Sequence, residues 1–291
     1  MLSFRRAVPA DKARIFEISS QVWDGGDYIE AVFDEWVKDT VGEFTVAEYG
    51  GTIAGFAKYT KISRKEIWLE GIRVDTAYAG RGFGSQMTEY YIKKAMVEGA
   101  EVIRLSTYKE NLESISILEK YSFKKDGYFT FAEKKLAAPL EVKPASNIVN
   151  IMSTATAWEL ITKRSAYVMS NGYISFGWLF KKLTYELIDS LVKGKKVYGV
   201  LSEGNISSIL ILGEDSHKDG GMCISYLDGN IASMKKLIDF ALYEAERSAA
   251  PYLSVMAPVY EEMIDALEMC EFDFLHDKYR EVNVFVYSKT L

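Results

Sequence analysis

WLEGIRVDTAYAGRGFGSQMT, residues 68–88, joins a strand, a glycine-rich turn and the start of a helix. Residues 67–74 are mostly apolar or β-branched, which suits a buried strand, and the run stops at Asp75, where turn residues begin. Three glycines then alternate with an arginine and a phenylalanine over residues 80–84. Glycine lets the backbone adopt positive φ and lets a ligand approach main-chain N–H groups. This stretch therefore predicts a strand, loop and helix that can receive a ligand.

The helix expected over residues 84–98 makes the loop a candidate anion site. Its first N–H groups have no partners within the helix, and the positive end of the helix dipole points at the loop. A phosphate or pyrophosphate is the natural ligand. Two nucleotide motifs fit poorly. A P-loop needs a lysine that GFGS, residues 82–85, does not contain, and the G-x-G-x-x-G fingerprint meets Met87 where its last glycine belongs.

Two segments, in the expected order, resemble motifs of the GNAT N-acetyltransferases. Residues 74–84, VDTAYAGRGFG, resemble the acetyl-CoA loop Q/R-x-x-G-x-G/A, with Ala79 in place of Gln or Arg. Residues 111–123, NLESISILEKYSF, resemble the later helix, N-x-x-A-x-x-x-Y-x-K-x-G-F. The second segment departs from that pattern at Ser114, Leu118 and Ser122. The alternative interpretation is a glycine turn that packs a helix on a sheet and binds no ligand.

The resemblance implies that acetyl-CoA is the co-substrate and that an acetyl group is moved to an amine. Backbone N–H groups of the loop would bind the pyrophosphate, backbone groups of Ile72 and Val74 would pair with the pantetheine arm, and Asn111 would help to hold it. The residues expected to bind acetyl-CoA are Ile72, Arg73, Val74, Gly80, Arg81, Gly82, Phe83, Gly84, Ser85 and Asn111.

Glu70 is the candidate general base. In several GNAT enzymes a glutamate at this strand position takes the proton of the amine, directly or through water. Apolar neighbours such as Trp68 and Ile72 are expected to raise the pKa of this carboxyl by desolvation. The alternative is a salt-bridged or surface-facing strand residue.

The general acid stays open. The tyrosine of the family motif falls on Leu118, which cannot donate a proton. Tyr121 and Tyr108 lie nearby in the sequence, and packed aromatic residues are the alternative interpretation of both. Water can also protonate the CoA thiolate, because this thiolate is a good leaving group.

The segment QVWDGGDY, residues 21–28, is expected between the first two helices, where GNAT proteins usually build the acceptor pocket. The resemblance makes Trp23, Asp24, Asp27 and Tyr28 candidates for substrate binding, with the carboxylates pairing to a cationic amine. The alternative is a turn between two helices that contains two caps and a core tryptophan.

The composition is that of an ordinary globular chain, and its 291 residues suggest two domains. A net charge of -6 at pH 7 argues against a nucleic-acid partner, which normally goes with a basic excess. No apolar run approaches the ~20 residues needed to span a bilayer, and no signal-peptide pattern opens the chain. We therefore expect no membrane partner and a cytoplasmic location. The two cysteines and two histidines lack zinc-ligand spacing, so we expect no metal.

Strand and turn patterns divide the chain into two copies of one arrangement. The first, over residues 1–137, reads strand, two helices, three strands, helix, strand, helix and strand, which is the order of the GNAT family. Residues 138–150 are expected to be a linker, and residues 151–291 repeat the order. The predicted fold class is α/β (α+β), with two tandem GNAT-like domains. Each is a mixed, mainly antiparallel sheet flanked by helices, and the first is catalytic.

The second copy is predicted to be degenerate because it lacks the glycine loop. It has Asp228-Gly229-Asn230 where the first copy has three glycines. Asp228 or Asn230 would cap the next helix well, but a carboxylate there repels an anion. We therefore expect only the first domain to bind acetyl-CoA. The second would be structural or would supply part of the acceptor site.

Within the family, the chain is similar to histidine N-acetyltransferase-like members in four features. These are the segment of residues 21–28, called the acceptor loop below, the WLEG sequence of residues 68–71, the leucine in place of the motif tyrosine, and the degenerate second domain. The resemblance implies that the acceptor is a primary amine of a small molecule, with a free amino acid such as histidine as the lead. The alternative is a non-catalytic module that senses acetyl-CoA or a metabolite. Exposed edges and the linker allow a homodimer, but nothing in the sequence demands one.

Overall fold

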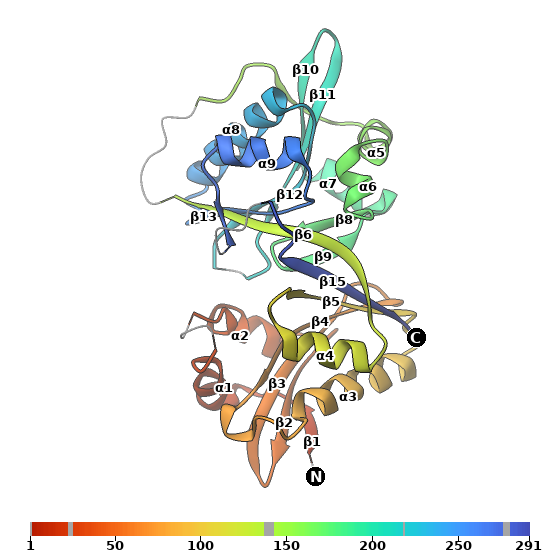
Figure 1. Ribbon diagram of the computed structural model, residues 1–291, viewed down its shortest axis with the longest axis vertical. Coiled ribbons are helices and arrows are strands. Elements are labelled where there is room, and N and C mark those ends of the chain that lie inside the picture. Colours follow the sequence, from red (N-terminus) through yellow and green to blue (C-terminus); the bar gives the residue numbers. More distant parts are fainter. Residues whose placement is uncertain (1, 23–25, 137–142, 218, 276–279) are drawn as a thin grey trace. The chain divides into compact units, whose positions relative to one another are not determined.

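The computed structural model describes residues 2–22, 26–136, 143–217, 219–275 and 280–291. The chain divides into two compact units (Figure 1). Unit 1 contains Met1–Thr107, Asn111–Lys125 and Val286–Leu291, and unit 2 contains Tyr108–Glu110 and Asp126–Phe285. Each unit is built on a mixed sheet with helices against it. The predicted α/β class, with a mixed sheet flanked by helices, is confirmed.

Unit 1 places a largely antiparallel sheet between two pairs of helices. Its strands are β1 (Ser3–Arg6), β2 (Glu43–Tyr49), β3 (Thr52–Lys61), β4 (Glu66–Val74) and β5 (Val102–Tyr108). Its helices are α1 (Lys12–Ser19), α2 (Ile29–Lys38), α3 (Phe83–Val97) and α4 (Leu112–Lys120), with short 3-10 turns η1 (Pro9–Asp11) and η3 (Thr76–Tyr78). Neighbouring strands follow the order β1-β2-β3-β4-β5; β4 pairs with β5 in parallel, and the other pairings among these five strands are antiparallel.

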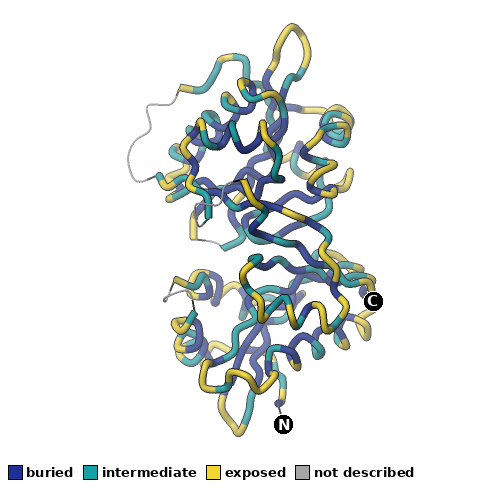
Figure 2. The backbone as a smooth tube through the Cα atoms, in the orientation of Figure 1, coloured by how far each residue is buried: buried dark blue, intermediate teal, exposed yellow. Residues whose placement is uncertain are grey.

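Local sequence accounts for most of these boundaries. The Gly50-Gly51 pair makes the β2–β3 turn, and Tyr49 pairs with Thr52 on either side of it. The α1 and α2 face of the sheet carries an aromatic core in which Trp36 and Phe44 rings meet edge to face, 5.2 Å apart. On the α3 face, the rings of Tyr59 and Tyr91 stack 5.7 Å apart. Figure 2 shows the sheet strands buried beneath partly exposed helices.

Unit 2 contains a second sheet and helices on both of its faces. Its strands are β6 (Lys124–Lys135), β7 (Ile148–Asn150), β8 (Tyr173–Phe176), β9 (Leu179–Lys182), β10 (Val197–Ser202), β11 (Asn205–Glu214), β12 (Met222–Asp228), β13 (Tyr252–Ala257) and β14 (Asp273–Phe274), together with the first two residues of β15 (Val284–Thr290). Its helices are α5 (Thr154–Thr162), α6 (Ser165–Met169), α7 (Tyr185–Lys193), α8 (Ile231–Arg247) and α9 (Glu261–Met269). The first two residues of β6 and most of β15 are assigned to unit 1.

The last strand of each unit comes from the other half of the chain. β6 ends the expected first domain, yet it pairs antiparallel with β13 of unit 2, from Thr130–Ala257 to Lys135–Tyr252. In unit 1 the strand next to β5 is the C-terminal β15. These units therefore divide the chain differently from the expected ranges 1–137, 138–150 and 151–291. Unit 1 includes the end of the chain, and unit 2 includes β6.

Unit 2 repeats the strand order of unit 1 with additions. In its order β7-β10-β11-β12-β13-β6, the fourth strand, β12, is followed along the chain by a long helix, α8, as β4, the fourth strand in the order of unit 1, is followed by α3. The short helix α6 and the separate β8–β9 hairpin have no counterpart in the predicted element order. That the second half is a degenerate copy of the first stays a prediction.

Candidate active site

The first feature of the site is the point where β4 and β5 separate. Their parallel pairing runs from Glu66–Val102 to Trp68–Arg104, and β4 then continues to Val74 (Figure 1). The other edge of β4 stays paired with β3 as far as Val74. Beyond Trp68, the edge of β4 that points away from β3 has no strand partner among the described residues, and its Ile72 carbonyl accepts a hydrogen bond from Arg73 Nη1 at 3.1 Å. Ile72 and Val74, expected to bind the pantetheine arm, lie on this part of β4.

A bulge redirects β4 just before the loop. The register with β3 shifts between Lys58–Glu70 and Phe56–Arg73. Gly71 has φ 65° at this shift, and a Cβ atom there would lie 2.9 Å from Cη2 of Trp36. Only glycine fits both the backbone angle and the close approach of the indole. The bulge therefore fixes how Glu70 is presented toward the α1 and α2 side.

The glycine loop has the geometry of an anion site. Gly82 is the N-cap of α3 with φ 72°, and a Cβ atom built on it would meet nothing within 4 Å. The N–H of Gln86 donates to the Gly82 carbonyl at 3.0 Å as a first helical bond. The N–H groups between them lie at the helix N-terminus, where no intrahelical acceptor exists. Gly80, φ 74°, has equally open space around it. Backbone donors and the helix dipole together suit a phosphate group.

Side chains anchor this loop at both ends. The Asp75 carboxylate accepts the N–H of Ala77 at 2.8 Å and pairs with Arg14 of α1. Phe83 is buried, with its ring 5.2 Å from that of Tyr49. The Arg81 guanidinium lies 5.7 Å from the Tyr49 ring centroid and brings a positive charge to the loop. These contacts hold the glycines in place without filling the space in front of them.

The start of α3 packs closely on α4. A Cβ atom on Gly84 would lie 3.2 Å from Cδ1 of Ile117, so the small residue sets the distance between the two helices. The Ser85 hydroxyl accepts a hydrogen bond from Lys120 Nζ at 2.8 Å and shares one with the Tyr121 hydroxyl at 3.0 Å. Lys120 therefore adds a second positive charge near the helix N-terminus.

Asn111 and the tyrosine candidates are placed as follows. The Oδ1 atom of Asn111 accepts the N–H of Ser114 at 3.1 Å, so this side chain caps α4, and its amide donors take no part in that bond.

Leu118 is buried in the position of the motif tyrosine. Tyr121 is hydrogen-bonded to Ser85. Burial raises the pKa of Tyr108 to about 12, and its ring packs 4.5 Å from Trp178 within unit 2. These contacts leave the general acid unassigned.

Glu70 occupies the α1 and α2 face of the sheet. Its Oε1 atom accepts a hydrogen bond from the Thr60 hydroxyl at 2.7 Å, and its cross-strand partner is Lys58. Burial raises the pKa of Glu70 above its usual value, and the Thr60 bond and the Lys58 charge oppose this only in part. A carboxyl with a raised pKa beside an open strand edge suits a general base.

Of the four residues predicted to bind the substrate, the structure describes Asp27 and Tyr28. Trp23 and Asp24 lie outside the described residues. Asp27 accepts two hydrogen bonds from Arg73 and one from Ser19, and its side chain is 2% exposed. Its carboxylate is therefore engaged within the protein in this structure. The Tyr28 ring meets Trp36 edge to face at 5.8 Å, and burial, followed by the charge of Glu70, raises the Tyr28 pKa. Among the acceptor candidates that the structure describes, Tyr28 is thus the one whose pKa the charge of Glu70 raises.

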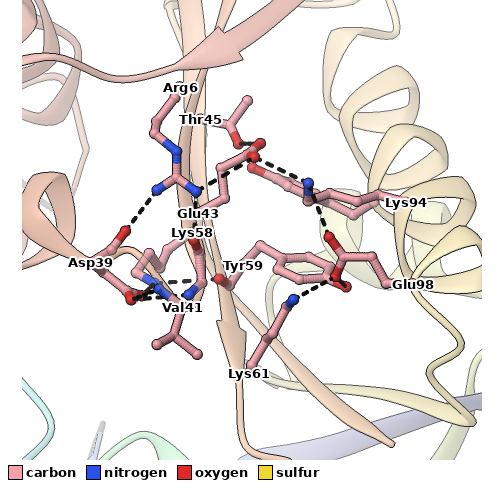
Figure 3. Close-up of polar contacts among 12 residues, drawn as sticks. Arg6, Asp39, Val41, Glu43, Thr45, Lys58, Tyr59, Lys61, Lys94 and Glu98 are labelled. Atoms are coloured by element: carbon pink, nitrogen blue, oxygen red, sulfur yellow. Dashed lines mark hydrogen bonds and ion pairs between the residues drawn. The ribbon is translucent and has the colours of Figure 1, made fainter. Parts of the chain in front are cut away.

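Lys58 also belongs to a network of polar side chains that the sequence analysis did not predict (Figure 3). The Lys58 side chain is 3% exposed and pairs with Asp39, which follows α2 and also accepts the N–H groups of Val41 and Gly42. On β2, Glu43 pairs with Lys94 of α3 at 3.1 Å. The network ties α2, β2, β3 and α3 together and holds an ammonium opposite Glu70. The polar Lys58 and Thr60 at alternate positions of the buried β3 are the only sequence signal for it.

The described residues contain neither a metal-binding cluster nor a membrane-spanning helix. No group of three or more His, Cys, Asp or Glu side chains among them could hold a metal ion. No helix in the described part of the chain is both long and apolar enough to cross a membrane.

Comparison with known proteins connects this geometry with a family. Residues 12–123 match the model of the acetyltransferase (GNAT) family, and this range contains Glu70, the glycine loop and Asn111. The spermine/spermidine N(1)-acetyltransferase of Bacillus subtilis is 26% identical over 96 residues, which are 30% of this chain and 63% of that protein. The N-alpha-acetyltransferase RimI of Mycobacterium tuberculosis is 26% identical over 122 residues, 40% of this chain and 75% of that protein.

The fold likeness extends further than the sequence likeness. A solved structure of a GCN5-related N-acetyltransferase from Sphaerobacter thermophilus covers 99% of this chain and 95% of its own, with a TM-score of 0.61 and 14% sequence identity. At that identity the likeness concerns the fold alone. The sequence match to the Bacillus protein spans less than two thirds of that relative.

Proposed function

Because residues 12–123 match the acetyltransferase (GNAT) family, we propose that this chain is an acetyl-CoA-dependent N-acetyltransferase acting on a primary amine of a small molecule. One observation carries the proposal. The open edge of β4, the glycine loop and the α3 N-terminus follow one another, and Glu70 lies on the same strand. The thioester of acetyl-CoA bound along the open edge of β4 would therefore lie beside the candidate base, Glu70.

The proposed acetyl-CoA contacts use backbone groups. N–H groups of residues 80–85 receive the pyrophosphate, with Arg81 and the helix dipole adding positive potential. Backbone groups of Ile72 and Val74, on the part of β4 beyond its pairing with β5, pair with the pantetheine amides, and the Ile72 carbonyl leaves its 3.1 Å hydrogen bond from Arg73 Nη1 to do so. The amide donors of Asn111 serve the same arm. The open space at Gly80 and Gly82 is what this approach requires.

The proposed reaction assigns one proton transfer to Glu70. The ionised carboxylate takes a proton from the substrate ammonium, and the neutral amine nitrogen attacks the thioester carbonyl carbon. A C–N bond forms, the C–S bond breaks as CoA leaves as its thiolate, and water takes the second proton from the nitrogen to give the neutral amide. Since Leu118 cannot donate a proton, water protonates the thiolate, and Glu70 returns its proton to solvent.

The acceptor is proposed to enter beside Tyr28. Our lead is the α-amine of a free amino acid such as histidine, as the sequence resemblance implies. The named relatives suggest the alternatives of a polyamine and a protein N-terminus. Trp23, Asp24 and Asp27 stay in the proposal as acceptor-loop residues, although Asp27 must leave Arg73 to reach a substrate. A cytoplasmic location and a homodimer stay predictions.

The test is CoA release from acetyl-CoA with free amino acids, polyamines, aminoglycosides and short peptides. Wild type is compared with Glu70→Gln and with the control Glu101→Gln, whose surface carboxylate pairs with Lys65. We expect one amine class to release CoA, a loss of at least about tenfold, or 1.4 kcal/mol, in Glu70→Gln, and no loss in the control. Binding of acetyl-CoA with no release by any amine would instead favour a sensing module.

A further inference from the structure

We propose that Thr60 is a positioning residue for Glu70, holding Oε1 of the carboxylate so that Oε2 faces the substrate amine. This role rests on the proposed acetyltransferase function. It assigns to β3 a part of the site that neither the family motifs nor the acceptor loop contains. The distance between Thr60 Oγ1 and Glu70 Oε1 is 2.7 Å.

The sheet register explains why this threonine reaches Glu70. Lys58 is directly opposite Glu70, and Thr60 is opposite Trp68, so Lys58 and Thr60 share one face of β3. Thr60 is therefore the diagonal neighbour of Glu70 on that face. The bulge at Gly71 fixes this register. A β-branched side chain has few χ1 choices, so its hydroxyl is an ordered donor.

The bond divides the two carboxylate oxygens between two tasks. Oε1 is oriented by the hydroxyl, and Oε2 is assigned to the amine proton. Without the hydroxyl, the carboxylate gains rotational freedom about its last side-chain bond. A base that samples several orientations meets the ammonium proton in fewer of them, which lowers the turnover number.

Other charged and titratable groups also act on Glu70, so the contribution of Thr60 must be separated from theirs. Lys58 on β3 lowers the Glu70 pKa and is itself paired with Asp39. Burial is the main cause that raises the Glu70 pKa, and the charge of Glu35 on α2 raises it further. Tyr28 lies within electrostatic range. Arg73 on β4 is neutralised by Asp27. Because the Thr60 bond favours the charged carboxylate, its loss moves the acidic limb of the pH–rate profile to higher pH.

The experiment measures kcat and KM against pH for wild type, Thr60→Val and Thr60→Ser, using the amine found in the panel. Valine keeps the shape and removes the donor, and serine keeps the donor. We expect Thr60→Val to lose about tenfold in kcat with an acidic limb at higher pH. Thr60→Ser should restore both. The Kd for acetyl-CoA should stay unchanged, because Thr60 is outside the cofactor loop.

A double variant separates positioning from a merely structural role. In a Glu70→Gln background, Thr60→Val should cost no further activity, since the group that Thr60 orients has lost its function. Thr60→Ala replaces Thr60→Val if valine prevents folding. A Thr60→Val enzyme with wild-type kcat and an unmoved acidic limb overturns the positioning role alone. A wild type that releases no CoA with any amine overturns the proposed function and this role together.

Discussion

The Asp27 carboxylate and the Arg73 guanidinium form two parallel hydrogen bonds, from Nε to Oδ2 at 2.9 Å and from Nη2 to Oδ1 at 3.0 Å. Both side chains are shielded from water, with 2% of Asp27 and 15% of Arg73 exposed. The pair joins Asp27, just before α2, to Arg73 near the end of strand β4. The Arg73 guanidinium also lies 5.9 Å from the Tyr28 ring centroid. One ion pair thus holds Asp27 against the strand that is proposed to bind acetyl-CoA.

Asp27→Asn should destabilise the protein, because it leaves the Arg73 charge buried without a counter-ion. Removing one partner of a buried pair typically costs about 3–5 kcal/mol in the free energy of unfolding. Adding Arg73→Met should recover part of this loss, since no lone charge then remains. Urea denaturation of the single and double variants measures the coupling.

Asp34→Asn is the matched control. Asp34 lies on α2, is 70% exposed and pairs with Lys12 at 3.2 Å, so its loss should change stability by less than about 1 kcal/mol. If Asp27→Asn unfolds like wild type but raises KM for the amine, then Asp27 binds substrate and the ion pair is not its main role.

Gly82→Ala should weaken acetyl-CoA binding. Space is not limiting, because a Cβ atom at Gly82 meets nothing within 4 Å, but φ 72° costs a non-glycine residue about 1–2 kcal/mol. A shifted loop misdirects the N–H groups at the start of α3, and we expect a loss of about tenfold in affinity by titration calorimetry.

The chain supplies a control with the same backbone strain in Gly99→Ala. Gly99 follows α3 at its other end, with φ 75° and nothing within 4 Å of a built Cβ atom. Gly99→Ala should lose similar stability and keep its affinity for acetyl-CoA. Equal affinity losses in both variants would show that general destabilisation, not the loop, is being measured.

Local signals in the sequence were sufficient for much of unit 1. The Gly50-Gly51 turn fixed the hairpin, and the strands expected over residues 43–49 and 52–61 have those bounds in the structure. The helix expected over residues 84–98 begins one residue earlier, at Phe83. Turns, caps and alternation act over a few residues, so a sequence states them directly.

Long-range pairings could not be predicted in this way. The strand pattern around residues 128–134 indicates a strand but not which sheet receives it, and β6 pairs with β13 rather than closing the first sheet. The charge of Asp27 suggested a ligand for an amine, which stays a prediction, while its ion pair with Arg73, 46 residues away, could not be predicted from local sequence. The Thr60–Glu70 bond depends on a bulge, which shifts register without changing the strand pattern.

Removing residues 286–291 should damage unit 1, although they lie at the far end of the chain. They belong to unit 1, where β15 is the strand next to β5, and Val286 and Tyr287 are 0% and 1% exposed. Each buried side chain contributes about 1.5–3 kcal/mol, and β5 would lose its neighbour. We expect a lower urea midpoint and loss of acetyl-CoA binding.

Removal of Leu291 alone is the mild comparison. It deletes one hydrogen bond, from the Leu291 N–H to the Glu101 carbonyl at 3.0 Å, and should cost about 1 kcal/mol. A chain ending at Phe285 that binds acetyl-CoA with wild-type affinity would show that β15 is not needed by unit 1.

Unit 2 should bind no acetyl-CoA, so titration should give one molecule per chain. Asp228 ends β12, where its carboxylate accepts the N–H of Ala166 of α6 at 2.6 Å and lies 3.5 Å from Arg164. The side chain of Asn230 already caps α8. Asp228→Asn should leave the stoichiometry at one, because α6 still covers the strand end. A stoichiometry of two in wild type would contradict the degenerate character of this half.

Glu70 should make the folded protein less stable as pH rises, because burial raises its pKa above the usual value. The stability contributed by its neutral form is fully present below the unfolded-state pKa and is lost as pH rises through the folded-state pKa. Glu70→Gln stays neutral and keeps an oxygen for Thr60. Its urea midpoint should therefore exceed that of wild type at about pH 7.5, with the difference shrinking toward about pH 4.

Glu43→Gln should change stability with pH in the opposite direction. Burial raises the Glu43 pKa, but bonds from Thr45 and Lys94 outweigh it and leave the pKa below its usual value. Its charged form therefore stabilises the fold, and that contribution is lost as pH falls through the folded-state pKa. Glu43→Gln should be less stable than wild type at neutral pH and should converge with it in acid. If Glu70→Gln also loses stability at neutral pH, then Lys58 and Thr60 hold Glu70 as a structural anion. An inactive variant that gains stability is instead the result expected of a catalytic carboxylate kept at a cost to the fold.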